Sequence, residues 1–204
     1  MTVDETRAAG AVVEILDALN GDRLVGLGVA LPGGAVATSC QCLPRPTGNA
    51  TLPDPDAPGI LVLVRIRRPG TDRRAFAIVT YAEPCSGLAL LGSATAAGLT
   101  VPDELNPALR VEELLQELAP ALPEPSPSWE GPVRLGAPGG AFGAGELRGA
   151  TLFAPGLAEL LPGAPVLGES GRAIGIVSHG GASAALCRFS EHLPAASLLV
   201  ATPS

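Results

Sequence analysis

The sequence predicts an all-β fold built from many short strands. Apolar runs of strand length alternate along the chain with clusters of glycine, proline, asparagine and aspartate, which form turns. The 204 residues include 26 glycines and 21 prolines, so we expect frequent tight turns and few long helices. The length suits one large domain or two small ones, and a pair of packed six-stranded antiparallel barrels fits it well.

The first part of the chain carries the strand signals of one barrel. Residues 12–16 and 24–31 are apolar runs on either side of a turn signal at residues 20–22. Residues 44–59 are broken by proline, glycine and aspartate, and we expect a surface loop there. The remaining expected elements are strands at residues 60–67 and 74–81, a hairpin tip at residues 68–73 and a closing strand at residues 88–91.

Residues 93–130 have a different character from the rest of the chain. A helical stretch could start at Asp103-Glu104, and a clearer helix signal follows it before Pro120. The apolar stripe of that helix consists of Val111, Leu114, Leu115 and Leu118. Packing onto the barrels explains this stripe better than a groove for a partner does. Residues 123–128 form a stiff, proline-rich linker.

These signals predict three parts of the chain. We expect an N-terminal barrel over residues 11–92, an interdomain segment with a short helix over residues 93–130, and a C-terminal barrel over residues 131–200. Within the last part, the strands should run from about residue 132 to about residue 189, and Ser190 to Leu193 should form a short C-terminal helix.

Charge and termini limit the classes of partner. The net charge of -7 repels a phosphate backbone, which argues against a nucleic-acid partner. Residues 1–7 lack the basic and apolar regions of a secretory signal, and no apolar run is long enough to span a membrane. We therefore expect a cytoplasmic protein without a membrane partner. Its four cysteines should mostly be reduced and buried as small apolar residues.

Three groups of motifs occur in a fixed order along the chain. GLGVAL at residues 26–31 is followed by GGAVATSCQCL at residues 33–43. SGLALL at residues 86–91 follows a tyrosine and a proline within residues 81–84. LPGAPVL at residues 161–167 is followed by IGIVS at residues 174–178. Each motif alone is weak in a sequence rich in alanine, valine, leucine and glycine, so their order and spacing carry the argument.

Together these motifs resemble those of the trypsin-like serine proteases, over about residues 11–92 and 131–200. The resemblance implies two packed six-stranded β-barrels of the trypsin-like type. It also implies that Gln41 stands at the position of the catalytic His, Gly87 at that of the Asp and Pro162 at that of the nucleophilic Ser. The separation of 46 positions from Gln41 to Gly87 is close to that usual in the family.

The residues at these three positions cannot perform the chemistry of the family. A catalytic triad needs a hydroxyl to attack, an imidazole to move the proton and a carboxylate to orient the imidazole. Gln41, Gly87 and Pro162 supply none of these groups. Pro162 also lacks the backbone N–H that the nucleophile position contributes to the oxyanion hole. The sequence therefore predicts a pseudoprotease.

A displaced nucleophile is the alternative. Ser170 lies in Gly168-Glu169-Ser170-Gly171, which superficially resembles the nucleophile motif, but it stands only five positions before Gly175. That spacing favours a hairpin turn. Cys40, Cys42 and Cys85 flank the vacated His and Asp positions, so a relocated thiol or a metal site could be imagined. Without a matched pair of histidines, buried core cysteines are the better interpretation, and no cofactor or metal is implied.

The resemblance also indicates where a ligand would bind. It places Ser178, His179 and Gly180 on the edge segment that pairs with an extended substrate in active relatives, and it places Leu160 in the same cleft. His179 is either a ligand contact or a solvated loop residue. His192 has no visible chemical partner. The cluster of Arg65, Arg67, Arg68, Arg73 and Arg74 is interpreted as solvated edge residues that discourage aggregation.

Three functional hypotheses follow. In the first, the chain is a pseudoprotease that binds or scaffolds a protein or peptide partner in a bacterial regulatory or defence system, as the likeness to protease modules used that way implies. In the second, it is an active hydrolase with a displaced serine or cysteine. In the third, it is a structural module that positions larger partners through residues 93–130. The partner, its peptide preference and the oligomeric state stay open.

Overall fold

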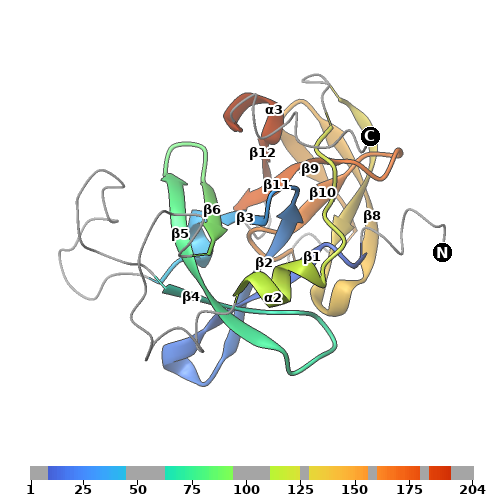
Figure 1. The fold of residues 1–204 in the computed structure, drawn as a ribbon. Helices are drawn as coiled ribbons and strands as arrows, with labels where there is room; N and C mark the ends of the chain where they lie inside the picture. Colours follow the sequence, from blue (N-terminus) through green and yellow to red (C-terminus); the bar gives the residue numbers. More distant parts are fainter. Residues whose placement is uncertain are drawn as a thin grey trace.

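Two closed antiparallel β-barrels of six strands each make up the fold, which confirms the predicted fold class (Figure 1). The computed structural model describes residues 9–44, 63–93, 111–124, 129–155, 160–179 and 184–193. In the first barrel the strand order is β1-β2-β3-β6-β5-β4, and in the second it is β10-β11-β12-β9-β8-β7. This is the chymotrypsin-type arrangement, in which both barrels share one topology.

The strands of the first barrel lie close to the positions that the apolar runs predict. They are β1 (Val12–Asp17), β2 (Arg23–Leu31), β3 (Ala35–Ser39), β4 (Leu63–Arg67), β5 (Arg74–Glu83) and β6 (Leu88–Gly92). The turn between β1 and β2 needs left-handed backbone, which Gly21 (φ 70°) and Asp22 (φ 61°) provide. The predicted loop at residues 44–59 lies outside the described residues except for Pro44.

The second barrel is formed by shorter strands. They are β7 (Gly131–Gly136), β8 (Phe142–Arg148), β9 (Thr151–Phe153), β10 (Pro165–Leu167), β11 (Ala173–His179) and β12 (Ala185–Arg188). The helix α3 (Phe189–His192) follows directly, as predicted, and buries Phe189 between the barrels. The interface core also includes Val29, Leu88 and Ile176, so side chains of both barrels share one apolar cluster.

The segment between the barrels contains one described α-helix and an extended strap. The helix α2 (Val111–Gln116) is shorter than its apolar stripe suggests, but Val111, Leu114 and Leu118 are all buried against the first barrel's core. The interpretation of the stripe as packing surface is therefore confirmed. Asp103-Glu104, the other predicted helix start, lies outside the described residues.

After α2, residues 119–124 attach to both barrels. The Ala121 N–H donates to the carbonyl of Ala30 in β2, and the Ala173 N–H in β11 donates to the carbonyl of Leu122. Pro123 forms an isolated parallel bridge with Ala173, so the first residues of the predicted linker act as a strap across the two sheets. Residues 125–128 of that linker lie outside the described residues.

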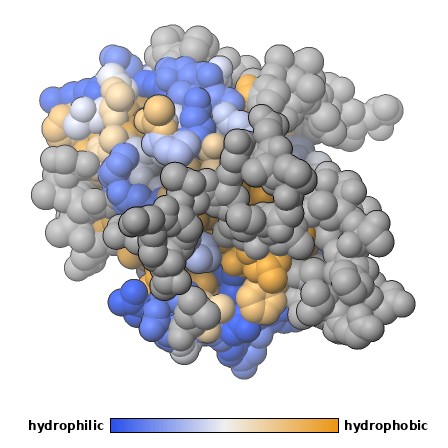
Figure 2. All heavy atoms as spheres, turned by 90° about the vertical axis from the view of Figure 1, so that its left-hand side faces the viewer, coloured by the Kyte–Doolittle hydropathy of each residue, from blue (hydrophilic) through white to orange (hydrophobic). Residues whose placement is uncertain are grey.

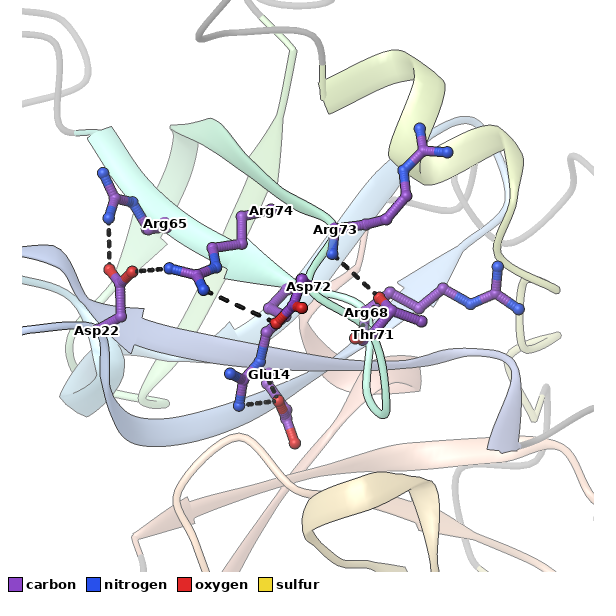
Figure 3. A network of polar contacts seen from close by, with 9 residues as sticks. Glu14, Asp22, Arg65, Arg68, Thr71, Asp72, Arg73 and Arg74 are labelled. Carbon is purple, nitrogen blue, oxygen red and sulfur yellow. Dashed lines mark hydrogen bonds and ion pairs between the residues drawn. The ribbon is translucent and has the colours of Figure 1, made fainter.

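The arginine cluster does not lie on a free strand edge, so that part of the prediction is wrong, although Arg73 and Arg74 are exposed to solvent as expected. β4 pairs with both β1 and β5, because the barrel closes and leaves no edge there. The arginines are instead ion-paired, and Figure 3 shows the pairs of Arg65 and Arg74 with Asp22. Asp22 accepts hydrogen bonds from Arg65 and Arg74, and these guanidinium groups hold the pKa of its carboxyl below the usual value. The other pairs are Arg67 with Glu14, and Arg68 and Arg73 with Glu117.

The described surface exposes few large apolar side chains. Figure 2 shows one face, on which hydrophobic patches lie between hydrophilic margins. Among the described residues, the large apolar side chains classed as exposed are Leu63, Tyr81 and Phe153, which come from three different strands. None of the described helices has the length and apolar character needed to cross a bilayer.

Candidate functional site

A short 3₁₀ turn, η2 (Cys40–Cys42), presents Gln41 at the junction of the barrels. Ser39 caps this turn: its buried Oγ accepts a hydrogen bond from the Gln41 N–H at 3.1 Å. The same Oγ donates to the carbonyl of Ser178 in the second barrel at 2.7 Å. One hydroxyl therefore fixes the turn and ties it to the opposite barrel, while the Gln41 side chain stays exposed.

Gly87 lies directly behind this turn. Its carbonyl accepts a hydrogen bond from the Cys40 N–H at 2.8 Å, and its own N–H donates to the carbonyl of Glu83 at 2.9 Å. Its backbone is left-handed, with φ of 78°. A Cβ atom here would lie 3.1 Å from the Cβ of Ser178, so a side chain would be both strained and crowded.

Pro162 enters the same junction from the second barrel. Its carbonyl accepts hydrogen bonds from the Leu27 N–H at 2.9 Å and from the thiol of Cys42 at 3.3 Å. The next residue, Gly163, donates its N–H to the carbonyl of Val177 at 2.7 Å. The segments that carry Gln41, Gly87 and Pro162 thus meet in space, although the sequence separates the first from the last by 121 positions.

The predicted ligand-binding residues differ in exposure. Ser178 is buried, and its Oγ donates to the carbonyl of Ala185 at 3.1 Å. His179 is exposed at the end of β11, with its Nδ1 3.1 Å from the Ser178 Oγ. Leu160 is half-buried against the core of the second barrel. Gly180 lies outside the described residues. Of the described members of this set, His179 is therefore the one best placed to contact a ligand.

The thiols near the junction are poorly suited to act as nucleophiles. All four cysteines are free, and burial raises the pKa of Cys42 and of Cys187 to about 11. Burial also raises the pKa of Cys40. A protonated thiol is a weak nucleophile and a weak metal ligand. Within the described residues, no three His, Cys, Asp or Glu side chains are grouped so that they could hold a metal ion. Cys85 is exposed, so the expectation that the cysteines are mostly buried does not hold for it.

These thiol environments predict a simple alkylation result. With iodoacetamide at pH 8, we expect Cys85 to react first and alone on a time scale of minutes, because it is the exposed thiol. Cys42 and Cys187 should react only after denaturation, when all four thiols become accessible. Mass spectrometry of the intact and digested protein gives the number and position of the labels. Rapid labelling of Cys42 in the folded protein would contradict the burial described above.

Ser170 lies in the hairpin turn between β10 and β11, which confirms the turn prediction. The Gly171 N–H donates to the carbonyl of Gly168 at 3.0 Å, and the Gly168 N–H donates to that of Arg172 at 2.9 Å. The exposed Ser170 Oγ lies 3.3 Å from a carboxylate oxygen of Glu124 on the strap. A serine beside a carboxylate, with no imidazole to take its proton, is not an activated nucleophile.

His192 does have a partner, contrary to the sequence-based interpretation. Its Nδ1 lies 3.0 Å from a carboxylate oxygen of Glu83, which also accepts a hydrogen bond from the Ser86 Oγ at 2.7 Å. This contact links α3 of the second barrel to the end of β5 in the first. In this group the Glu83 carboxylate lies between the Ser86 hydroxyl and the His192 imidazole, whereas a Ser-His-Glu relay has the imidazole in the middle, so the order is wrong for a relay.

Sequence reasoning missed two residues that shape this junction, Ser39 and Glu83. Ser39 could have been found as a capping residue directly before a turn. Glu83 carried no signal, because its partner His192 lies more than one hundred positions away.

The fold and the junction together define a protein of the trypsin-like serine protease fold. Comparison with solved structures identifies several bacterial proteases that this chain is similar to at low identity. An inactive serine-to-alanine mutant of Rv3671c from M. tuberculosis shares 18% identity with a TM-score of 0.56, covering 91% of this chain and 85% of that one. The MamO protease domain from Magnetospirillum magneticum shares 16% identity with a TM-score of 0.54, covering 91% and 95%.

A third similar structure is the serine endoprotease from Yersinia pestis, at 15% identity and a TM-score of 0.57, covering 92% of this chain and 62% of that one. No protein-family description matches the chain. No curated protein matches it either. Identities this low support the shared fold and nothing finer.

Proposed function

We propose that this chain is a catalytically inactive homologue of the trypsin-like serine proteases that binds an extended protein or peptide segment at the junction of its barrels. The observation that carries the proposal is the meeting of Gln41, Gly87 and Pro162 at one place. The fold is kept, and the segments that would carry a triad meet, yet the groups needed for acyl transfer are missing.

The loss of chemistry at Pro162 is twofold. It has no hydroxyl, and its nitrogen carries no hydrogen that could stabilise an oxyanion. Loss of one oxyanion donor alone costs about two to three orders of magnitude in rate. Its carbonyl is occupied by two donors from the first barrel, which fixes this segment in place.

Binding needs none of these groups. An extended peptide can pair with an unpaired strand edge through main-chain hydrogen bonds. The register of β11 with β10 stops at Ile176, and β11 continues past it to the exposed His179. Cys42 and Cys187 are buried with raised pKa values, and Ser170 lies in a hairpin turn beside a carboxylate, so none of these three groups is an activated nucleophile. Inactive binding is thus the function that these side chains favour over displaced hydrolysis.

Activity-based labelling tests the first half of the proposal. We expect no reaction with a fluorophosphonate probe and no cleavage of a mixed peptide library above background, beside an active trypsin-like protease as control. Labelling or cleavage would contradict the proposal, and mapping the labelled residue would identify the true nucleophile. Variants with Ser170→Ala, Cys40→Ala and Cys85→Ala would then show whether a displaced group is responsible.

Selection from a phage-displayed library of random peptides tests the second half. We expect enriched peptides whose binding falls in a His179→Asp variant and is unchanged in a Glu146→Ala variant, since Glu146 is exposed on β8 and bonds to Arg148. If no peptide is enriched, or if enriched peptides bind both variants equally, the proposal that peptides bind at the junction is wrong.

A further inference from the structure

The side chain of Gln41 lies on the surface at the point where the two barrels meet. It is exposed, and in the described part of the chain its amide group has no hydrogen-bond partner. The neighbouring residues on both sides are held in place by contacts to other strands. Gln41 is therefore an exposed polar side chain carried by a backbone turn, residues 39–42, that contacts to both barrels hold in place; this turn is called the base below.

The base is fixed by contacts in both barrels. On the first barrel, the Cys40 N–H donates to Gly87 and the Cys40 thiol donates to the carbonyl of Leu88 at 3.1 Å. On the second, the Ser39 Oγ donates to Ser178 and the Cys42 thiol to Pro162. These thiols stay protonated because burial raises their pKa, so they remain donors. Rigid presentation lowers the entropy lost when a side chain binds a ligand.

We propose that Gln41 recognises the main chain of the bound peptide, which rests on the function proposed above. A primary amide has one acceptor oxygen and an NH₂ donor group. A residue in an extended chain directs its own N–H and C=O toward the same side, as in a β-ladder. The amide oxygen of Gln41 can accept from the peptide N–H, and its NH₂ group can donate to the peptide C=O. Such a contact is independent of the peptide's side chains, so Gln41 supplies affinity and register, and not sequence preference.

The chain offers a matched control, because Gln116 is the other glutamine. It is exposed at the end of α2, the helix that packs against the core of the first barrel. We expect Gln41→Ala to weaken the binding of a peptide selected on the wild-type protein by about tenfold, as for loss of one or two hydrogen bonds. Gln116→Ala should leave the affinity unchanged. The peptide affinity of Gln41→Glu, which keeps an acceptor but loses the donor, should lie between the affinities of Gln41→Ala and Gln116→Ala.

N-methylation of the peptide then separates recognition from a structural effect. Each backbone nitrogen of the selected peptide is methylated in turn, and the affinity of each is measured for wild type and Gln41→Ala. We expect one methylated position to weaken wild type about tenfold and Gln41→Ala by no more than about twofold, the coupling expected of a direct contact. Thermal unfolding of each variant checks that the fold is intact.

The outcomes distinguish the two proposals. If no peptide is enriched in the selection, the proposed function fails and this inference fails with it. If peptides bind but Gln41→Ala binds them as well as Gln116→Ala does, binding stands and the role of Gln41 is wrong. If Gln41→Ala weakens binding equally for every methylated peptide, Gln41 does not contact the main chain.

Discussion

Replacing Gly163 with alanine should destabilise the protein by at least about 4 kcal/mol, enough to unfold a marginally stable domain. A Cβ at this position would lie 1.9 Å from the carbonyl oxygen of Leu27 and 2.5 Å from the Oγ1 of Thr38. The first of these atoms is backbone, so it cannot turn away. Relief requires the second barrel to move away from the first, which breaks the hydrogen bond from Leu27 to Pro162.

The left-handed backbone of Gly163, with φ of 77°, lowers the stability of an alanine variant independently of the clash. A second glycine with similar backbone and no nearby atoms measures this backbone contribution separately. Gly33, in the turn between β2 and β3, has φ of 86°, and a methyl group added there would have no atom within 4 Å. Gly33→Ala should therefore lose only about 1 kcal/mol. Urea unfolding of both variants gives the difference. If both variants lose the same free energy of unfolding, the barrels do not pack closely at Gly163 and this explanation is wrong.

This comparison also shows where sequence reasoning stops. The apolar runs placed five of the six strands of the first barrel to within three positions, since side chains of a strand face opposite sides of a sheet. The glycines could not be ranked in the same way. Nothing in the local sequence distinguishes Gly163 from Gly33. In the fold, however, Gly163 faces a backbone oxygen of the other barrel, and Gly33 faces open space.

Long-range pairing explains the predictions that were wrong. The arginines were assigned to a free edge because hairpin signals are local, whereas β4 pairs with β1 across some fifty positions of sequence. His192 was left without a partner for the same reason. The candidate site was partly predictable, because the order and spacing of the motifs pointed to segments that do meet. The hydrogen bonds from Ser39 to Ser178 and from Cys42 to Pro162, which hold these segments together, join residues more than one hundred positions apart and have no local sequence pattern.

The ion pair of Arg67 with Glu14 is the arginine contact on which stability should depend most. The Glu14 side chain is only 6% exposed, and one of its carboxylate oxygens accepts hydrogen bonds from Arg67 at 2.7 Å. The other oxygen accepts from the Gly139 N–H of the second barrel at 3.2 Å. Glu14 therefore connects the two barrels while its charge is balanced by a single guanidinium group.

Arg67→Leu should cost about 2–3 kcal/mol in the free energy of unfolding, because it leaves a buried carboxylate with one neutral donor. This is below the usual cost of breaking a fully buried pair, since the Arg67 side chain is 29% exposed. Arg68→Leu on the same hairpin is the control. Its pair with Glu117 is 3.5 Å long and exposed to solvent, so it should cost no more than about 0.5 kcal/mol.

A second substitution tests whether the unpaired charge is the cause. Adding Glu14→Gln to Arg67→Leu removes the buried charge but keeps an acceptor for the Gly139 N–H, so the double variant should regain at least about 1 kcal/mol over Arg67→Leu alone. Urea unfolding of the three variants measures these differences. If Glu14→Gln destabilises the Arg67→Leu protein further, the loss comes from packing of the arginine stem, and the charge of Glu14 is tolerated without its partner.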